Sequence, residues 1–310
     1  MNGRHSRLLA IGLLIPVLLA SLLLAAASGC AGRPRAAAPP GDNPGRQQAA
    51  LATLTGPLKV HFIDVGQGDS ILVQIPNKQT MLIDAGDSSK GPAVTRYLKA
   101  QGIESIDYLV VTHPHLDHIG GMADVLATFP VSGIYMPRTS HTTTAYEDLL
   151  RAIKKKGLFV TEARAGLRVL EAANLDVSFI APVGKGYEDL NEWSAVLRVV
   201  YGDTALLFTG DAGAKSEAEM ISSKAPLRAD VLKIGHHGSA GSTSASFLSA
   251  VSPEFAVISV GAGNPYGHPA KKTLARLADA KARVYRTDLH GTIVVISDGS
   301  QIAVQTAKEP

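Results

Sequence analysis

Residues 112–121 read Thr-His-Pro-His-Leu-Asp-His-Ile-Gly-Gly, which places three histidines and one aspartate within six positions. The stretch directly follows a short apolar segment that is typical of a β-strand. His113 and His115 can point the same way, because side chains two apart on an extended chain share a face. Asp117 and His118 begin the helix that follows. Imidazole and carboxylate groups suit zinc, manganese or iron, so the stretch predicts two adjacent ligand sets for a dinuclear metal site.

The other histidines strengthen this interpretation. The chain has ten histidines, and six of them lie in glycine-rich loops near predicted strand ends, at positions 113, 115, 118, 236, 237 and 268. Such a concentration is not expected of histidines scattered over a surface.

Hydrophobic periodicity predicts strands that alternate with helices. Strands are expected at 58–63, 71–75, 81–83, 108–111, 175–180, 195–201, 205–208, 231–234, 255–260, near 284 and at 292–296, and helices at 92–101, 146–156, 214–222, 244–251 and around 274–277. Each half of the chain gives strand pairs, an acid at a strand end (Asp84, Asp211), a helix, and a strand that runs into histidines. This order predicts an α/β protein in which two related sheets pack face to face, with helices outside.

The His-x-His-x-Asp-His motif resembles the signature of the metallo-β-lactamase fold, a four-layer αββα sandwich of two related halves. Residues 57–310 resemble in particular the extracellular hydrolase domain of ComEC competence proteins, as a stand-alone version. Besides the His113 motif, the resemblance is carried by residues 62–70, 191–194, 208–211, 233–239 and 264–269.

The resemblance implies a cofactor of two divalent metal ions, Zn²⁺ or Mn²⁺. His113 and His115 would hold one ion, while Asp117 and His118 would hold the other. Asp211 would bridge both, since a carboxylate has two oxygens.

One histidine of the family pattern is absent, and Asn191 occupies the expected place. An amide oxygen is a weaker ligand than imidazole, which favours a looser first site or a harder ion such as manganese.

The last histidine ligand stays open between two positions. His268 follows a predicted strand, which suits a final ligand. His236 or His237 could instead supply it, or assist catalysis together with Asp117. Neighbouring residues on an extended chain point to opposite sides, so we expect only one of the pair to face the metals.

Further polar residues are expected around this centre. Asp84 is predicted to orient a metal-bound histidine. The residues expected to contact substrate are Asp69, placed at the mouth of the site, together with Asn191, Ser194, Ser239 and Tyr266.

The N-terminus has the layout of an export signal. Arg4 and Arg7 precede an apolar run over 8–27, and small residues then lead to Cys30, the only cysteine. This pattern predicts a signal peptide over 1–30 with lipidation at Cys30; an uncleaved membrane anchor is the alternative.

Residues 31–56 are rich in Ala, Pro, Gly and Gln and predict a flexible linker before a hydrolase domain over 57–310. Both interpretations of the N-terminus place that domain outside the cytoplasmic membrane and tethered to it.

The formal net charge of +3 belongs to the N-terminus. Residues 1–56 contain five arginines and one acid, whereas 57–310 contain 25 basic and 26 acidic side chains. Bulk charge therefore gives no argument for nucleic acid binding, which would need a local basic groove.

The resemblance implies a metal-dependent hydrolase, in particular a phosphodiesterase or nuclease acting on extracellular DNA or nucleotide esters, with DNA-uptake machinery as a partner. A carbon-ester or lactam hydrolase of the same fold is one alternative. A non-catalytic module that binds DNA or a partner at the membrane is another.

Overall fold

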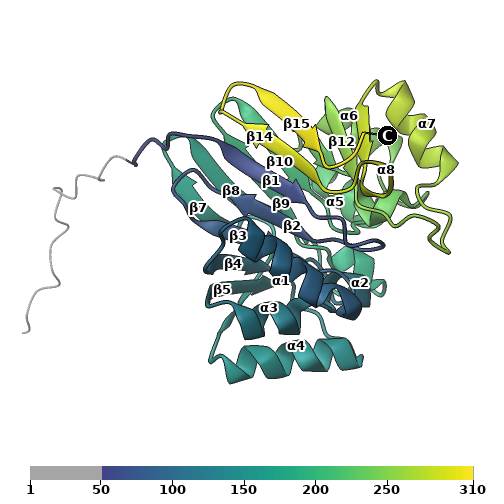
Figure 1. The fold of residues 1–310 in the computed structure, drawn as a ribbon. Helices are drawn as coiled ribbons and strands as arrows, with labels where there is room; N and C mark the ends of the chain where they lie inside the picture. Colours follow the sequence, from purple (N-terminus) through teal and green to yellow (C-terminus); the bar gives the residue numbers. More distant parts are fainter. Residues whose placement is uncertain (1–50, 310) are drawn as a thin grey trace, which may run out of the picture. The chain divides into compact units, whose positions relative to one another are not determined.

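Two β-sheets pack against each other, and helices cover both outer faces (Figure 1). This arrangement is seen in a computed structural model that describes residues 51–309. The predicted four-layer αββα architecture is confirmed.

The first sheet has eight strands in the order β15-β14-β1-β2-β3-β4-β5-β6. Their bounds are β1 Leu58–Phe62, β2 Ile71–Gln74, β3 Thr80–Ile83, β4 Ile106–Val110, β5 Val131–Met136, β6 Val160–Glu162, β14 Ile293–Ser297 and β15 Ile302–Thr306. The C-terminal hairpin β14–β15 returns to this sheet, where β14 pairs antiparallel with β1 (Figure 1).

The second sheet has seven strands in the order β13-β12-β11-β10-β9-β8-β7. Their bounds are β7 Arg168–Ala172, β8 Leu175–Ala181, β9 Val196–Tyr201, β10 Thr204–Phe208, β11 Val231–Lys233, β12 Phe255–Ile258 and β13 Arg283–Arg286. The four strands β10 to β13 are parallel, so their carboxyl ends lie at one edge.

Alternation along the strands divides the apolar side chains between layers. In β10, Leu206 and Phe208 enter the core between the sheets, whereas Ala205 and Leu207 face the helices outside. Since side chains alternate across a strand, each central strand supplies two cores at once.

The helices lie in two groups on the outer faces. Their bounds are α1 Gly91–Ala100, α2 Leu116–Ile119, α3 Met122–Thr128, α4 Thr144–Lys155, α5 Ala214–Ser222, α6 Ala245–Val251, α7 Lys271–Asp279 and α8 Thr287–His290, with 3₁₀ turns η1 Ser88–Lys90, η2 Leu190–Trp193 and η3 Gly235–Gly238. Buried side chains of α1, α3 and α4 pack on the first sheet, and those of α5, α6 and α7 pack on the second (Figure 1).

The sequence left several elements unpredicted, among them β5, β6, β7, β15 and α3, whereas the short helix expected at Asp117 and His118 is present as α2. β5 carries Gly133 at its centre, and β6 has three exposed residues at the edge of its sheet. Neither segment shows the alternation that marks a half-buried strand.

Among residues 51–309, no helix has the length and apolar character that crossing a bilayer requires. The predicted signal peptide, Cys30 and most of the predicted linker lie outside the described residues.

Candidate metal centre

Four strand ends deliver acids and histidines to one place. Asp84 follows β3, His113 follows β4, Asp211 follows β10, and His237 follows β11. The pairs β3–β4 and β10–β11 are parallel, so their carboxyl ends meet at the same edges of the two sheets. Ligand sites of α/β proteins typically form at this position.

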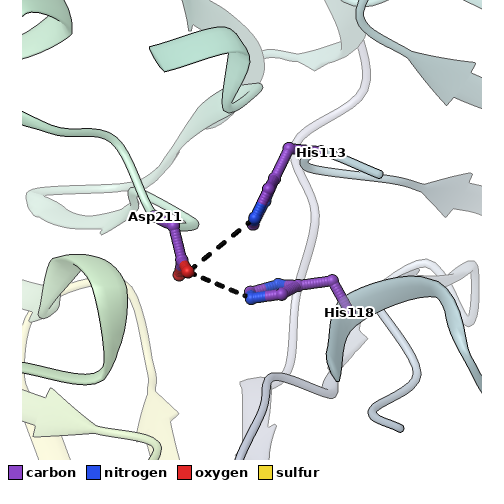
Figure 2. A group of neighbouring side chains, drawn as sticks. All are labelled: His113, His118 and Asp211. Atoms are coloured by element: carbon purple, nitrogen blue, oxygen red, sulfur yellow. Dashed lines mark ion pairs between the residues drawn. The ribbon is translucent and has the colours of Figure 1, made fainter. Parts of the chain in front are cut away.

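Asp211 lies at the centre of the cluster. Its Oδ2 is 3.3 Å from His118 Nε2, 3.5 Å from His237 Nε2 and 3.7 Å from His113 Nε2. Figure 2 shows the rings of His113 and His118 pointing toward this carboxylate from one side. One oxygen thus faces imidazoles from both sheets.

Asp117 joins the cluster through His237, whose Nε2 is 3.1 Å from Asp117 Oδ2. The Nδ1 of His237 donates to the carbonyl of Ser259 at 2.9 Å. Because a carbonyl can only accept, this bond fixes the ring and aims Nε2 at the two carboxylates.

Asp84 holds the ring of His118 in place. Its carboxylate accepts from the backbone N–H of Thr112 at 2.9 Å, from the Thr112 hydroxyl at 2.5 Å and from His118 Nδ1 at 2.7 Å. Full burial raises the pKa of Asp84 above its ordinary value. Asp84 therefore lies where an acid that orients a ligand histidine is expected.

Two glycines allow the loops of the site to approach one another. Gly68 has φ +126°, and a Cβ there would collide with the carbonyl oxygen of Asp117. Gly210 has φ +53° and lies against Thr112. Only glycine combines such backbone angles with such close contact, so both positions need it.

The carboxylates control the charge of the buried histidines. Burial alone would lower the pKa of His118, but Asp211 and Asp117 raise it well above its ordinary value. Burial is likewise outweighed at His237, where Asp211 and Asp117 raise the pKa to about 9. Burial also opposes ionisation of Asp211, yet the His237 and His118 charges hold its pKa well below the usual range. The cluster of carboxylates around Asp211 therefore attracts positive charge.

The side chains fit divalent ions. Three sets each bring ligand atoms within 4.8 Å of one another: His113, His118 and Asp211; Asp117, His118 and His237; and Asp69, Asp84 and His118. In the third set the acids already pair within the protein, Asp84 with His118 and Asp69 with Lys233. Within the described residues, His118 Nε2 and Asp211 Oδ1 are buried and have no hydrogen-bond partner. Buried polar atoms are rarely left unpaired, and here they belong to nitrogen and oxygen donors suited to zinc or manganese.

His115 and Asn191 flank this cluster. His115 Nδ1 lies 3.0 Å from His113 Nε2, so the two histidines turn toward each other as their spacing predicts. Asn191 lies in the turn η2, and its Oδ1 is buried with no hydrogen-bond partner among the described residues.

The structure separates the three candidates for the last histidine. His237 is buried among the carboxylates, whereas the side chain of His236 is 34% exposed with Nε2 3.8 Å from Asp211 Oδ2. The ring of His268 lies 5.6 Å from that of His236 and stacks at 5.7 Å on Tyr266, which is exposed. Neither His268 nor His115 is in any of the three candidate metal sets, and His268 Nδ1 is buried with no hydrogen-bond partner among the described residues.

The expected strand geometry of the 236/237 pair is not observed. Both residues lie in the turn η3 with φ near +50°, where side chains do not alternate as on a strand. Of the two, only His237 is buried in the cluster, as expected. The backbone of the tight turn, rather than alternation along a strand, places it there.

Asp69 does not lie at the mouth of the site as expected. Its side chain is 1% exposed, and its Oδ2 is 2.6 Å from Lys233 Nζ. Lys233 is fully buried and also donates to the carbonyl of Gly210 at 3.1 Å. Sequence reasoning assigned Lys233 no role, although a lysine inside the apolar run Val231–Ile234 is a signal that a buried acid lies nearby.

Ser194 differs from the substrate contact expected, whereas the role of Ser239 stays a prediction. Ser194 is fully buried, and its hydroxyl accepts from the backbone N–H of Asp211 at 3.0 Å, so it positions that loop. Ser239 is half-buried, and its hydroxyl accepts from Gly241 N–H at 3.3 Å.

Comparisons with known proteins agree with the motifs. The model of the metallo-beta-lactamase superfamily matches residues 63–262. ComE operon protein 3 of Bacillus subtilis is 34% identical over 252 residues, covering 76% of this chain and 32% of that protein. Competence protein ComA of Neisseria gonorrhoeae is 34% identical over 232 residues, covering 74% and 31%. The chain thus spans about a third of the length of these relatives, and the expected resemblance to competence proteins is confirmed.

Among solved structures, CmlA, a diiron beta-hydroxylase from Streptomyces venezuelae, is similar with a TM-score of 0.50 and 16% identity. The match covers 76% of this chain and 53% of CmlA. At this identity the likeness concerns the fold alone.

Proposed function

Because the chain belongs to the metallo-β-lactamase superfamily, we propose that it is a metal-dependent phosphodiesterase or nuclease acting on extracellular DNA or nucleotide esters. The observation that carries the proposal is the position of Asp211, whose Oδ2 lies within 3.8 Å of nitrogens from His113, His118, His236 and His237.

Two divalent ions, zinc or manganese, would be held by these side chains. We assign His113 and His115 to one ion, Asp117, His118 and His237 to the other, and Asp211 to both. Of the candidates that the sequence left open for the last histidine, we thereby choose His237 over His236 and His268. Such ions would activate water at neutral pH and neutralise charge that develops on the phosphoryl oxygens.

The protein's own groups would prepare the site for this chemistry. Asp84 holds the ring of His118 through Nδ1, and the Ser259 carbonyl holds His237 in the same way. Both histidines therefore present Nε2 to the ions, with their orientation set before any ion arrives.

His236 is the group best placed to give a proton to the leaving oxygen. It is the more exposed of the paired histidines, and its side chain makes no hydrogen bond within the described residues. It lies beside both Asp211 and His268. A histidine that reaches solvent and the reacting centre together suits general acid catalysis.

Similarity to competence proteins supports the choice of DNA as substrate. It also supports a place beside DNA-uptake machinery, on the outer side of the cytoplasmic membrane. The predicted lipidation at Cys30 would hold the domain there.

The test is hydrolysis by the purified protein with Mn²⁺ or Zn²⁺. We expect turnover of bis-(p-nitrophenyl) phosphate and of single- or double-stranded DNA, and none of a chromogenic β-lactam. Turnover of the lactam alone would replace the proposal with a lactam hydrolase. No turnover of any substrate with either metal would favour a non-catalytic binding module.

A further inference from the structure

A pocket of about 390 Å³ lies beside the candidate metal centre, outside its ligand sets. Its walls come from the segments that follow β5, β6 and β8, together with the turn η2. Pockets of this size commonly hold small molecules or parts of larger ligands.

The pocket is basic although its domain is nearly neutral. Arg138, Arg164 and Lys185 line it together with a single acid, Glu162. None of the three cations takes part in an ion pair within the described residues, whereas Arg151, Arg168, Arg283 and Arg286 elsewhere do. Clustered cations without partners produce a local field that attracts anions.

An aromatic ring forms part of the wall. Trp193 lines the pocket, and its Nε1 donates to the carbonyl of Tyr187 at 3.1 Å. Its polar edge is therefore occupied, and the side chain is only partly buried. Tyr187 packs edge to face against it at 5.2 Å, which holds the indole in place.

The walls are tied together by the backbone. Ala163 N–H donates to the carbonyl of Met136 at 2.8 Å, and Ala165 N–H donates to Pro182 at 3.0 Å. These bonds join the ends of β5, β6 and β8 on both sides of Arg164. A pocket formed in advance costs little ordering when a ligand binds.

Two residues of the pocket are close in the sequence to residues that contact the candidate metal centre. Trp193 precedes Ser194, whose hydroxyl holds the backbone of Asp211. Arg138 lies three residues before His141, whose ring is 6.1 Å from that of His115. Three residues span at most roughly 11 Å, so the backbone of Arg138 lies within that distance of His141.

We propose that this pocket is a subsite for an unpaired nucleotide adjacent to the phosphodiester at the metal centre, a proposal that rests on the proposed function. The base stacks on Trp193, and Arg138, Arg164 and Lys185 bind the neighbouring phosphates. Stacking and a basic groove are the common elements of single-strand recognition. A base inside a duplex does not offer its face to a pocket, so the site selects single strands.

Trp193 is the only tryptophan in the chain, so its emission reports on this pocket alone. We would titrate the protein in EDTA, which prevents turnover, with a thymidine hexanucleotide and with an abasic chain of equal charge. The thymidine chain is expected to quench the emission and to bind more tightly than the abasic chain. Equal quenching and equal affinity for the two chains would overturn the stacking assignment.

Variants separate the two kinds of contact, with affinity measured by anisotropy of a labelled hexanucleotide. Trp193→Leu is expected to weaken binding roughly 5- to 150-fold, and Trp193→Phe, which keeps an aromatic face, far less.

Arg164→Glu should weaken binding of the hexanucleotide and flatten the dependence of its affinity on salt. Arg96→Glu makes the same charge change on the exposed face of α1, outside the pocket. Thermal melting first shows that each variant is folded. An equal loss of affinity in the Arg96 and Arg164 variants would then refute the subsite. Equal affinity of wild type and Trp193→Leu would refute it as well.

Hydrolysis of bis-(p-nitrophenyl) phosphate by the wild-type protein with Mn²⁺ tests the metal centre separately. Hydrolysis without quenching would reject the subsite and leave the proposed function standing. Quenching without hydrolysis would reject the proposed function and leave nucleotide binding in the pocket standing.

Discussion

The Nζ of Lys233 lies 2.6 Å from a carboxylate oxygen of Asp69, and both side chains are buried beneath the candidate metal centre. The same Nζ donates to the carbonyl of Gly210, one residue before Asp211. The pair thus joins the loop between β1 and β2, residues 63–70, to the loop that carries the central carboxylate. A buried charge that loses its partner is strongly destabilising.

Replacing Lys233 with Met should therefore lower the free energy of unfolding by about 3–5 kcal/mol, because Asp69 would be left without its cation. Urea unfolding measures the loss. Lys99→Met, which removes an exposed lysine of α1, is the matched control. The double variant Lys233→Met with Asp69→Asn should lose less than the two single variants add up to, and strict additivity would contradict the pairing.

His237 and His268 should differ in metal binding. His237 Nε2 faces Asp117 and Asp211, while His268 stands beside His236, outside the candidate sets. We expect His237→Ala to weaken binding of one Mn²⁺ or Zn²⁺ ion in calorimetry by more than roughly 100-fold, beyond the usual loss of an orienting partner. His268→Ala should retain both ions, and the opposite pattern would restore His268 as a ligand.

Asp84→Asn should keep the shape of the site but weaken the hydrogen bond that orients His118. An amide can still accept from Thr112, but it no longer attracts the Nδ1–H of His118 as strongly. We expect a loss of about 10- to 100-fold in metal affinity or activity. Unchanged affinity, measured by competition with a metal-binding dye, would mean that the fold alone orients His118.

His61 should make stability depend on pH independently of the metal centre. Its ring contacts the Tyr97 hydroxyl at 2.8 Å and Gln74 Oε1 at 3.0 Å, and burial lowers its pKa below 6.5. As the pH falls below 6.5, the unfolded chain takes up the proton first, so the free energy of unfolding falls. Urea unfolding between pH 8 and pH 5 in EDTA should show a steeper decline for wild type than for His61→Gln. Parallel declines would contradict this role.

The sequence predicted the layers of the fold because alternation and helical periodicity are strong in the central elements. Helix α5 begins and ends where expected, at 214 and 222, and the hairpin around Gly202 forms β9 and β10. Edge strands such as β6 were missed because their side chains are exposed and carry no periodic signal.

The candidate site was predictable where several candidate ligands lie close together in the sequence, as they do from His113 to His118. How deeply each side chain is buried in the site was not predictable. Nothing in the order of residues showed that Asp69 lies beneath the histidines or that Lys233 meets it, because that pair joins two sheets. The choice of His237 depended on the backbone of η3, which a strand pattern does not describe.

The central claim is that Asp211 joins two metal ions in a phosphodiesterase. The most direct measurement is turnover of bis-(p-nitrophenyl) phosphate with Mn²⁺ by wild type, Asp211→Ala and His141→Ala, each repeated in EDTA. His141 lies close to His115 but belongs to none of the candidate sets, so it controls for disturbance nearby. We predict turnover by wild type and His141→Ala that EDTA abolishes, and none by Asp211→Ala. Turnover by Asp211→Ala equal to that of wild type, or turnover that persists in EDTA, would contradict the claim.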